Sequence, residues 1–272
     1  MGSQAKYMKS RAAQSSNQQS PRMAHAYQSK PLLLRVIRWG PWTYRFWREL
    51  IRPLYNRTLR NPAVVSTDKH FPAHTELLDN FIEIRKEVLA IALSGNRIPN
   101  YHEFSKHQKS FYEYDNKAWG MLPLRGYGFN YPENQNHFPT LKTFLKKHRN
   151  VVSATISFFP PGKVLRPHKG AFKFVWRYHL PLFVTELPNA RTSCELTIDS
   201  KTYFLKEGQG FLWDDTFMHS ATNQSDQARV VILFDIFRND QPLWLKLLSW
   251  SILFSAQLVQ TIKNTRQKAL LR

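Results

Sequence analysis

The sequence of 272 residues has a single cysteine, Cys194. One cysteine excludes a disulfide bond within the chain and a zinc site built from several cysteines. The sequence also lacks an uninterrupted apolar run of the roughly 20 residues that a membrane-spanning helix needs. No apolar segment follows the first positive charges. We therefore predict neither a spanning helix nor a secretory signal.

Acidic residues are scarce at both ends of the sequence. The chain has 39 Lys and Arg against 19 Asp and Glu, which gives a formal net charge of +20. Residues 1–60 carry +11 of this charge with Glu49 as their one acid, residues 241–272 carry +5 without an acid, and the middle carries only +4. Basic ends attract polyanions, either nucleic acid or an anionic membrane surface. The near-neutral middle and the absence of familiar nucleic-acid-binding motifs argue against nucleic acid.

The two ends differ from the middle in the kind of residues they contain. Residues 1–30 are rich in Ser, Gln, Lys and Arg, which predicts a disordered basic tail. Residues 31–60 interleave arginines at helical spacing with Trp, Tyr and Phe, which is typical of a helix in a membrane interface. The alternative is a helix packed on the domain with its arginines in water. Residues 241–272 predict an apolar and basic C-terminal helix, which lies in the interface, packs on the N-terminal helix or forms a short re-entrant hairpin.

The middle of the sequence predicts two helices followed by strands. Apolar residues at helical spacing predict helices over residues 74–95 and 139–148, while residues 96–138 show no clear period and are interpreted as irregular. From residue 151 onward, short strand-like segments alternate with turn residues. These segments are Val151–Phe159, Lys163–Pro167, Phe174–Val184, Cys194–Ile198, Thr202–Leu205, Gly210–Trp213 and Arg229–Phe237. The fold class predicted for residues 70–240 is mostly β with flanking helices and a double-stranded β-helix, or jelly-roll, core.

Two histidines are candidate metal ligands. His168 follows the second predicted strand, and His219 lies in a predicted loop after the strand Gly210–Trp213. A jelly roll makes its second and seventh strands neighbours, which would bring these two imidazoles together. Imidazole is a good ligand for Fe, Zn, Cu and Ni. On histidine content alone, two unrelated histidines remain the simpler interpretation.

Three further candidates lie on the predicted strands. Arg177 and His179 are two residues apart, so they share one face of their strand. Arg229 begins a strand that is apolar on both faces, and an unpaired buried guanidinium is costly. A bound carboxylate would satisfy it with two parallel hydrogen bonds. The alternative partner is an acid of the protein, namely Asp214, Asp215 or Asp235.

The spacing of these residues resembles a known family. The pattern runs from Ser157 over ten residues to His168 and over eight residues to Arg177 and His179. It continues with Asp214-Asp215-Thr-Phe-Met-His219 and, after nine intervening residues, Arg229. This pattern is similar to the aspartyl/asparaginyl β-hydroxylase family, which includes protein hydroxylases and bacterial lipid A 2-hydroxylases. The resemblance covers about residues 140–240, with a weaker match back to about residue 70.

The resemblance implies a jelly-roll dioxygenase that uses Fe(II), 2-oxoglutarate and O2. His168 and His219 would bind the iron, and Arg229 would hold the 5-carboxylate of 2-oxoglutarate. Ser157, Arg177 and His179 would help to hold the co-substrate. Many such oxygenases have a carboxylate ligand two residues after the first histidine, and this sequence has Gly170 there. The protein-hydroxylase branch of the family also lacks this acid, whereas an Asp is common in the lipid A branch.

We therefore expect a hydroxylase that acts on a C–H bond of a membrane-associated substrate, such as a lipid acyl chain. The basic, aromatic ends motivate this expectation, with an anionic membrane surface as the partner. We expect peripheral or monotopic attachment on the cytoplasmic side of a membrane. The alternative within the class is a peptidyl aspartate/asparagine β-hydroxylase. The alternative from another class is a non-catalytic β-barrel that binds an acidic ligand or nucleic acid.

Overall fold

The computed structural model describes residues 51–104, 117–127, 129–188, 191–263 and 269–271. The predicted tail over residues 1–30 and most of the predicted basic helix over residues 31–60 lie outside the described residues. Contacts divide the chain into two units, Met1–Trp39 and Gly40–Arg272. The second unit contains every element described below.

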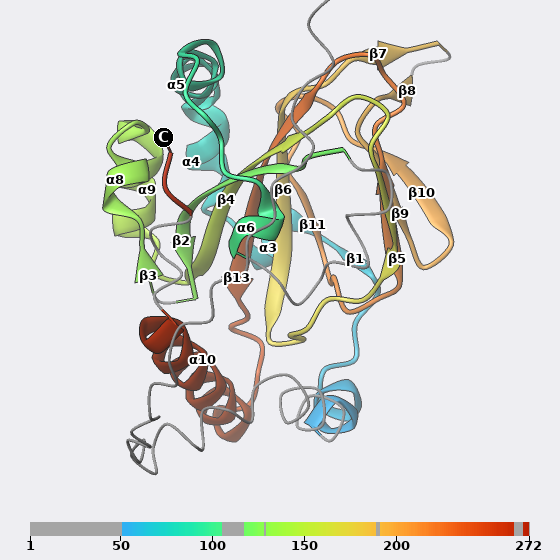
Figure 1. The fold of residues 1–272 in the computed structure, drawn as a ribbon. Helices are drawn as coiled ribbons and strands as arrows, with labels where there is room; N and C mark the ends of the chain where they lie inside the picture. Colours follow the sequence, from blue (N-terminus) through green and yellow to red (C-terminus); the bar gives the residue numbers. More distant parts are fainter. Residues whose placement is uncertain (1–50, 105–116, 128, 189–190, 264–268, 272) are drawn as a thin grey trace, which may run out of the picture. The chain divides into compact units, whose positions relative to one another are not determined.

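Antiparallel strands of the described residues form two main sheets (Figure 1). The larger sheet has the order β1 (Val64–Val65), β11 (Phe211–Trp213), β6 (Val175–Phe183), β13 (Arg229–Phe237), β4 (Val151–Phe159), β2 (Gly120–Gly126) and β3 (Phe129–Asn130). The smaller sheet has the order β10 (Lys201–Phe204), β9 (Glu195–Ile198), β12 (His219–Thr222) and β5 (Val164–His168). A separate ribbon pairs β7 (Glu186–Leu187) with β8 (Arg191–Thr192).

The two main sheets share a core, as the predicted jelly roll requires. Phe159, Trp213 and Val231 of the larger sheet pack with Leu196 and Ala221 of the smaller sheet in one buried cluster. Each strand segment predicted from residue 151 onward is present to within one residue at each end. The predicted fold class, mostly β with flanking helices and a jelly-roll core, is confirmed.

Helices cover the other face of the larger sheet (Figure 1). They include α4 (His74–Asp79), α5 (Phe81–Leu93) and α9 (Pro139–Lys147), beside the shorter α3 (Thr67–His70) and α8 (Pro132–Gln135). The short helix α6 (Tyr101–Phe104) differs, because its Tyr101 packs on the cluster between the two sheets. Phe144 of α9 stacks on Phe234 of β13 with ring centroids 5.9 Å apart. The predicted helix over residues 139–148 is thus confirmed, with its apolar face on the sheet.

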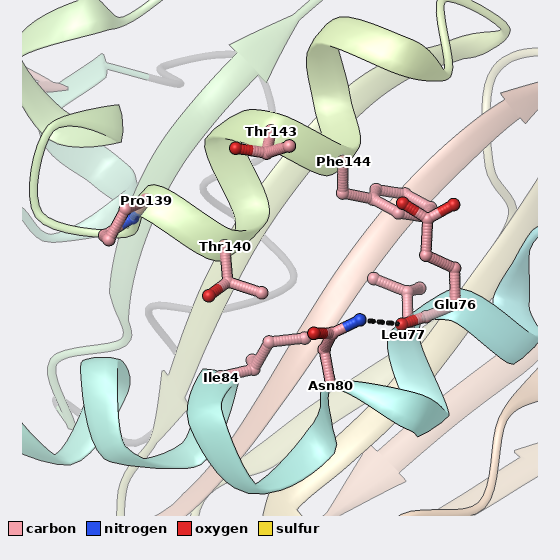
Figure 2. Close-up of a pocket in the computed structure, with 8 residues that line it drawn as sticks. All are labelled: Glu76, Leu77, Asn80, Ile84, Pro139, Thr140, Thr143 and Phe144. Carbon is pink, nitrogen blue, oxygen red and sulfur yellow. Dashed lines mark hydrogen bonds between the residues drawn. The ribbon is translucent and has the colours of Figure 1, made fainter.

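The predicted single helix over residues 74–95 is wrong, because the chain forms two helices that meet at Asn80. The Asn80 side-chain amide donates to the Glu76 carbonyl at 2.8 Å, and its backbone N–H also bonds back to α4 (Figure 2). Asparagine favours such local bonds over helix continuation. The break turns α5 against α9 around a pocket of about 340 Å³ that Ile84 and Phe144 help to line.

Two further predictions from the sequence need correction. Residues 96–138 are not irregular throughout, since they contain β2 and β3 at the edge of the larger sheet. Pro123 lies within β2, beside an irregularity in the pairing with β4, and a proline conceals a strand in the sequence pattern. His219 is not in a loop, because it begins strand β12. That strand has only four residues, too few for a recognisable period.

The C-terminal helix α10 (Leu243–Lys263) packs on the domain through one face. Residues 51–58 are also helical, and Tyr55 is buried there with its hydroxyl 2.8 Å from the Ser249 hydroxyl of α10. Along the described ranges, no helix combines the length and the apolarity needed to cross a membrane. The ends of the chain beyond these ranges stay predictions.

Candidate functional site

The two candidate histidines meet across neighbouring strands of the smaller sheet. Strand β12 pairs antiparallel with β5, and in this register His219 lies opposite His168. Their ring centroids are 4.0 Å apart, although 51 positions separate the residues in the sequence. The predicted pair therefore exists, and the pairing of two short strands creates it.

Both imidazoles are oriented in the same way by the backbone. His168 Nδ1 donates to the Arg166 carbonyl at 2.8 Å, and His219 Nδ1 donates to the Phe217 carbonyl at 2.9 Å. A neutral ring that donates from Nδ1 has its lone pair on Nε2, the atom that binds a metal. Burial lowers the pKa of His219 to about 3 and also lowers the pKa of His168. Both rings are thus neutral at neutral pH, as a metal ligand must be.

The space beside Gly170, where related oxygenases have a carboxylate ligand, is occupied by the side chain of Asp215. A Cβ added at Gly170 would collide with the carboxyl group of Asp215. The Gly170 N–H also donates to the Asp215 carbonyl at 2.6 Å, so the two segments are in direct contact. Among the described residues, no group of three or more His, Cys, Asp or Glu is arranged to hold a metal ion. The histidine pair therefore stays the candidate metal donor set that the described residues offer.

Arg177 is enclosed by acids of the protein. Its guanidinium forms ion pairs with Asp215, at 3.0 Å, and with Asp235. The Tyr127 hydroxyl donates to the same Asp235 carboxylate. Arg177 therefore anchors Asp215 beside Gly170, and its charge is balanced inside the protein. The predicted contact between Arg177 and the co-substrate stays a prediction.

Arg229 is a buried cation without a carboxylate partner among the described residues. Its Nη1 donates to three backbone carbonyls, those of Ser193, Glu195 and Thr222, at 2.9–3.3 Å. Its guanidinium carbon lies 4.4 Å from the centroid of the Phe159 ring. Its Nε has no hydrogen-bond partner in the described part of the chain. Burial lowers the pKa of Arg229, and the charges of Cys194 and Glu195 offset this effect only in part.

The three acids that the sequence offers as partners of Arg229 are engaged elsewhere. Asp215 and Asp235 pair with Arg177. Asp214 accepts from Lys173 Nζ at 2.7 Å and from the Thr216 hydroxyl at 2.6 Å. The interpretation with a protein acid is therefore not supported by the described contacts. A bound carboxylate fits the unsatisfied guanidinium.

Aromatic side chains complete the interior around these groups. His179 and His219 contact the Trp213 ring edge-on, with centroids 5.5 Å and 4.7 Å away. The Trp213 Nε1 is buried and has no hydrogen-bond partner within the described ranges. Ser157 accepts a hydrogen bond from Trp119 Nε1 at 2.9 Å. Neither Trp213 nor Trp119 was among the candidate residues predicted from the sequence, although Trp213 ends a predicted strand in alternation with Leu212.

One rule explains why these residues gather. In the middle of strands β4, β6 and β13, even-numbered residues such as Ala154, Tyr178 and Ile232 pack on the helices, so the odd-numbered residues between them face the smaller sheet. The odd-numbered set contains the predicted site residues of the larger sheet, Ser157, Arg177, His179 and Arg229. The histidine pair comes from the smaller sheet. All six predicted residues therefore belong to strands that enclose one interior.

Comparison with known sequences now identifies the family. The sequence pattern of the aspartyl/asparaginyl beta-hydroxylase family matches residues 78–239, which is more than half of the chain. The chain belongs to this family of hydroxylases. The match includes all six predicted site residues and all strands from β2 to β13.

Two curated relatives show the range of the family. The ornithine lipid ester-linked acyl 2-hydroxylase of Rhizobium tropici is 29% identical over 192 residues, which cover 71% of this chain and 66% of the relative. The human aspartate beta-hydroxylase domain-containing protein 2 is 30% identical over 128 residues, which cover 44% of this chain and 33% of the relative. The matched parts thus amount to less than two thirds of either relative.

Solved structures give only partial overlaps. A cupin domain of a transcriptional regulator from Enterobacter cloacae has a TM-score of 0.31 at 13% identity, covering 44% of this chain and 98% of that domain. A predicted oxalate decarboxylase from Thermotoga maritima has a TM-score of 0.30 at 14% identity, covering 44% of this chain and 82% of that protein. The strand order and the core between the sheets are the basis of the jelly-roll assignment.

Proposed function

We propose that this hydroxylase is an Fe(II)- and 2-oxoglutarate-dependent dioxygenase that hydroxylates a C–H bond of a lipid acyl chain. One observation carries the proposal. The jelly-roll interior contains two neutral histidines with Nδ1 held by the backbone and, on the facing sheet, a buried arginine that lacks a carboxylate partner among the described residues. A metal ion would bind the two histidines, and one carboxylate of a dicarboxylate would neutralise the arginine.

In this proposal His168 and His219 bind the iron through Nε2. Arg229 binds the distal carboxylate of 2-oxoglutarate, with its unsatisfied Nε as one donor. The Thr222 carbonyl that already accepts from Arg229 lies three residues along β12 from His219, so one short strand connects the two ends of the site. The bound iron would supply the activation of O2 that converts 2-oxoglutarate to succinate and CO2 and inserts a hydroxyl group into the substrate.

The other residues of the interior position these groups and exclude water. Phe159 lies against the Arg229 guanidinium and Trp213 against the His219 ring, so neither faces bulk water on that side. A low-dielectric wall strengthens the attraction between Arg229 and a carboxylate. Trp213 Nε1 supplies a further donor for a bound oxygen atom. Ser157 and His179 line the same interior and are proposed to contact the co-substrate.

The lipid substrate is proposed from the relative in Rhizobium tropici, whose name states an ester-linked acyl 2-hydroxylase. The alternative is hydroxylation of aspartate or asparagine in a peptide. Gly170 favours this alternative, because the resemblance associates a missing acid at this position with the protein-hydroxylase branch. The predicted location on the cytoplasmic side of a membrane stays a prediction.

The first experiment is anaerobic addition of Fe(II) and then 2-oxoglutarate to the purified full chain. We expect a weak visible charge-transfer band that is lost in His168→Ala and in Arg229→Ala. Lys86→Ala, at an exposed position of helix α5 on the other side of the larger sheet, should keep the band and serves as the control. Wild-type protein without a band, and without succinate when air is admitted, would instead support the non-catalytic binding module.

Substrate class is tested once succinate formation has been measured. Extracted membrane lipids and an acidic peptide library are each supplied, and products are examined by mass spectrometry for a gain of one oxygen atom. We expect the gain on a fatty acyl chain. A gain on aspartate or asparagine would establish the alternative while leaving the cofactor assignment intact.

A further inference from the structure

Helix α10 has a buried face and an exposed face. Leu245, Ser249 and Leu253 point into the domain, where the leucines pack with Tyr55, Phe237 and neighbouring residues. The Ser249 hydroxyl bonds to the Leu245 carbonyl and to Gln241 at 2.8 Å each. This face fixes the helix on the domain, so the side chains of its other face are held in position.

The exposed face of α10 is apolar. Five large side chains, between 49% and 73% exposed, lie on it: Leu243, Trp244, Leu247, Trp250 and Phe254. At about 100° per residue they occupy roughly a third of the helix circumference, opposite the buried face. No acidic residue occurs in the helix. A contiguous exposed apolar stripe of this kind marks an interaction surface. Tryptophan and leucine beside basic residues are characteristic of membrane interfaces.

A basic cavity adjoins this stripe. Its volume is about 590 Å³, and it is lined by Arg125, Lys146 and Arg149 together with Trp250 and Leu253 of α10. The remaining lining residues are Tyr127, Asn130, Val151 and Val152, so the lining contains three cations and no acid. Trp250 also stacks on Phe237 at 4.7 Å, which fixes it between the stripe and the cavity.

Within the described part of the chain, the positive charges that line the cavity have no acidic partner. Arg125 donates to the carbonyls of Leu145, His148 and Val151, all neutral acceptors, at 2.6–3.2 Å. Burial lowers the pKa of Arg125, and the neighbouring positive charge of Arg149 lowers it further. Among the described residues, neither Lys146 nor Arg149 has an ion pair. A phosphate in the cavity would relieve this repulsion and accept charge-assisted hydrogen bonds.

We propose that this face of the protein binds an anionic phospholipid bilayer. The stripe of α10 lies in the interface of the bilayer, and a lipid phosphate enters the basic cavity beside Trp250. Charge complementarity selects a membrane over other apolar partners, because stripe and cavity together contain cations without acids and the whole chain carries +20. This binding needs neither iron nor 2-oxoglutarate, so it stands or falls separately from the proposed reaction.

The experiment is co-sedimentation of the full chain with vesicles of phosphatidylcholine alone and of phosphatidylcholine mixed with phosphatidylglycerol. We expect binding to the mixed vesicles, and much weaker binding to the neutral ones. High salt is included because it screens the diffuse attraction of the basic ends more than it weakens apolar contact. Equal binding to both kinds of vesicle would overturn the role of the anionic lipid.

A matched pair of variants tests the stripe. Leu247 on α10 and Ile82 on α5 are each 63% exposed on a helix, so an aspartate at either position should leave folding intact. We expect Leu247→Asp to weaken vesicle binding about tenfold or more at high salt, since one large apolar contact with the bilayer is lost. Ile82→Asp should bind like the wild type. Equal loss in both variants, or in neither, would overturn the proposal.

A second pair tests the cavity. The cavity variant is the double substitution Lys146→Glu/Arg149→Glu. The control is the double substitution Lys201→Glu/Lys206→Glu, which changes the net charge by the same amount. All four positions are exposed. We expect roughly a tenfold larger loss of binding to anionic vesicles for the cavity pair. Equal losses would show that only the total charge matters. If Leu247→Asp instead converts a dimer to a monomer in sedimentation velocity, the stripe binds a second copy and the bilayer proposal is wrong.

Discussion

The two faces of the larger sheet differ although the same strands form both. On the face toward the helices, β6 and β13 contribute Trp176, Tyr178, Ile232 and Phe234, all buried and packed as one cluster. On the face toward the smaller sheet, the residues that alternate with this set on the same strands include Arg177, His179, Arg229 and Asp235. Strand geometry sends neighbouring residues to opposite faces. One face can therefore supply stability while the other carries charges that are costly to bury.

The apolar face should show the largest effect on stability. Phe234 stacks on Phe144 and on Tyr178, with centroids 5.9 Å and 6.1 Å away. We expect Phe234→Ala to lower the free energy of unfolding by about 3–5 kcal/mol, because it leaves a cavity in a close-packed core. Ser157→Ala on the inner face should cost only about 1 kcal/mol, the value of one hydrogen bond. Urea unfolding of both variants measures the difference, and similar losses would contradict the comparison.

The space between Gly170 and Asp215, beside the inner face, should reject the acid that the family pattern allows at position 170. Gly170→Asp would force a second carboxyl group onto that of Asp215. We expect a loss of about 3 kcal/mol from overpacking and like-charge contact. Combining it with Asp215→Gly should restore part of the loss, since the space then becomes free. Urea unfolding of the double-mutant cycle tests this, and strictly additive losses would show that the two positions are independent.

Ligand binding should stabilise the protein through the inner face alone. In the presence of Fe(II) and under anaerobic conditions, we add 2-oxoglutarate at a hundredfold excess over its Kd. We expect 2-oxoglutarate to raise the free energy of unfolding by about 2.7 kcal/mol. Arg229→Met should lose the part that depends on 2-oxoglutarate, because it removes the cation that lacks an anion. Thermal unfolding with and without each ligand measures the gain. An unchanged gain in Arg229→Met would refute the carboxylate role.

The smallest expected effect on stability comes from Glu76 of helix α4, which belongs to neither face of the larger sheet. Glu76 accepts from Lys147 Nζ at 2.6 Å and is 3.0 Å from His148 Nε2, and these contacts lower the pKa of Glu76 below its ordinary value of 4.5. A lowered carboxyl pKa adds stability above the unfolded pKa, and this stability is lost as pH falls through the folded pKa. Glu76→Gln should therefore cost about 0.5 kcal/mol at neutral pH. Urea unfolding at neutral and acidic pH should show this cost vanish in acid.

Much of the fold was predictable because strand alternation and turn residues are local signals. The segments Val151–Phe159 and Arg229–Phe237 are correct at both ends. The helix break at Asn80 and the strand around Pro123 were not predicted, because Asn80 forms local hydrogen bonds inside an otherwise helical pattern and a proline conceals the strand. His219 was identified as a site residue but assigned to a loop, since a four-residue strand has no period of its own.

The sequence by itself determined the candidate residues for the chemistry, because the spacing of Ser157, His168, His219 and Arg229 resembles that of the family. It also determined the alternation that sends their neighbours to the opposite face. Only the tertiary structure decided that Arg229 has no carboxylate partner among the described residues, that Asp215 fills the space beside Gly170, and that α10 exposes an apolar stripe next to a basic cavity. These features depend on contacts between distant segments, which no local pattern encodes.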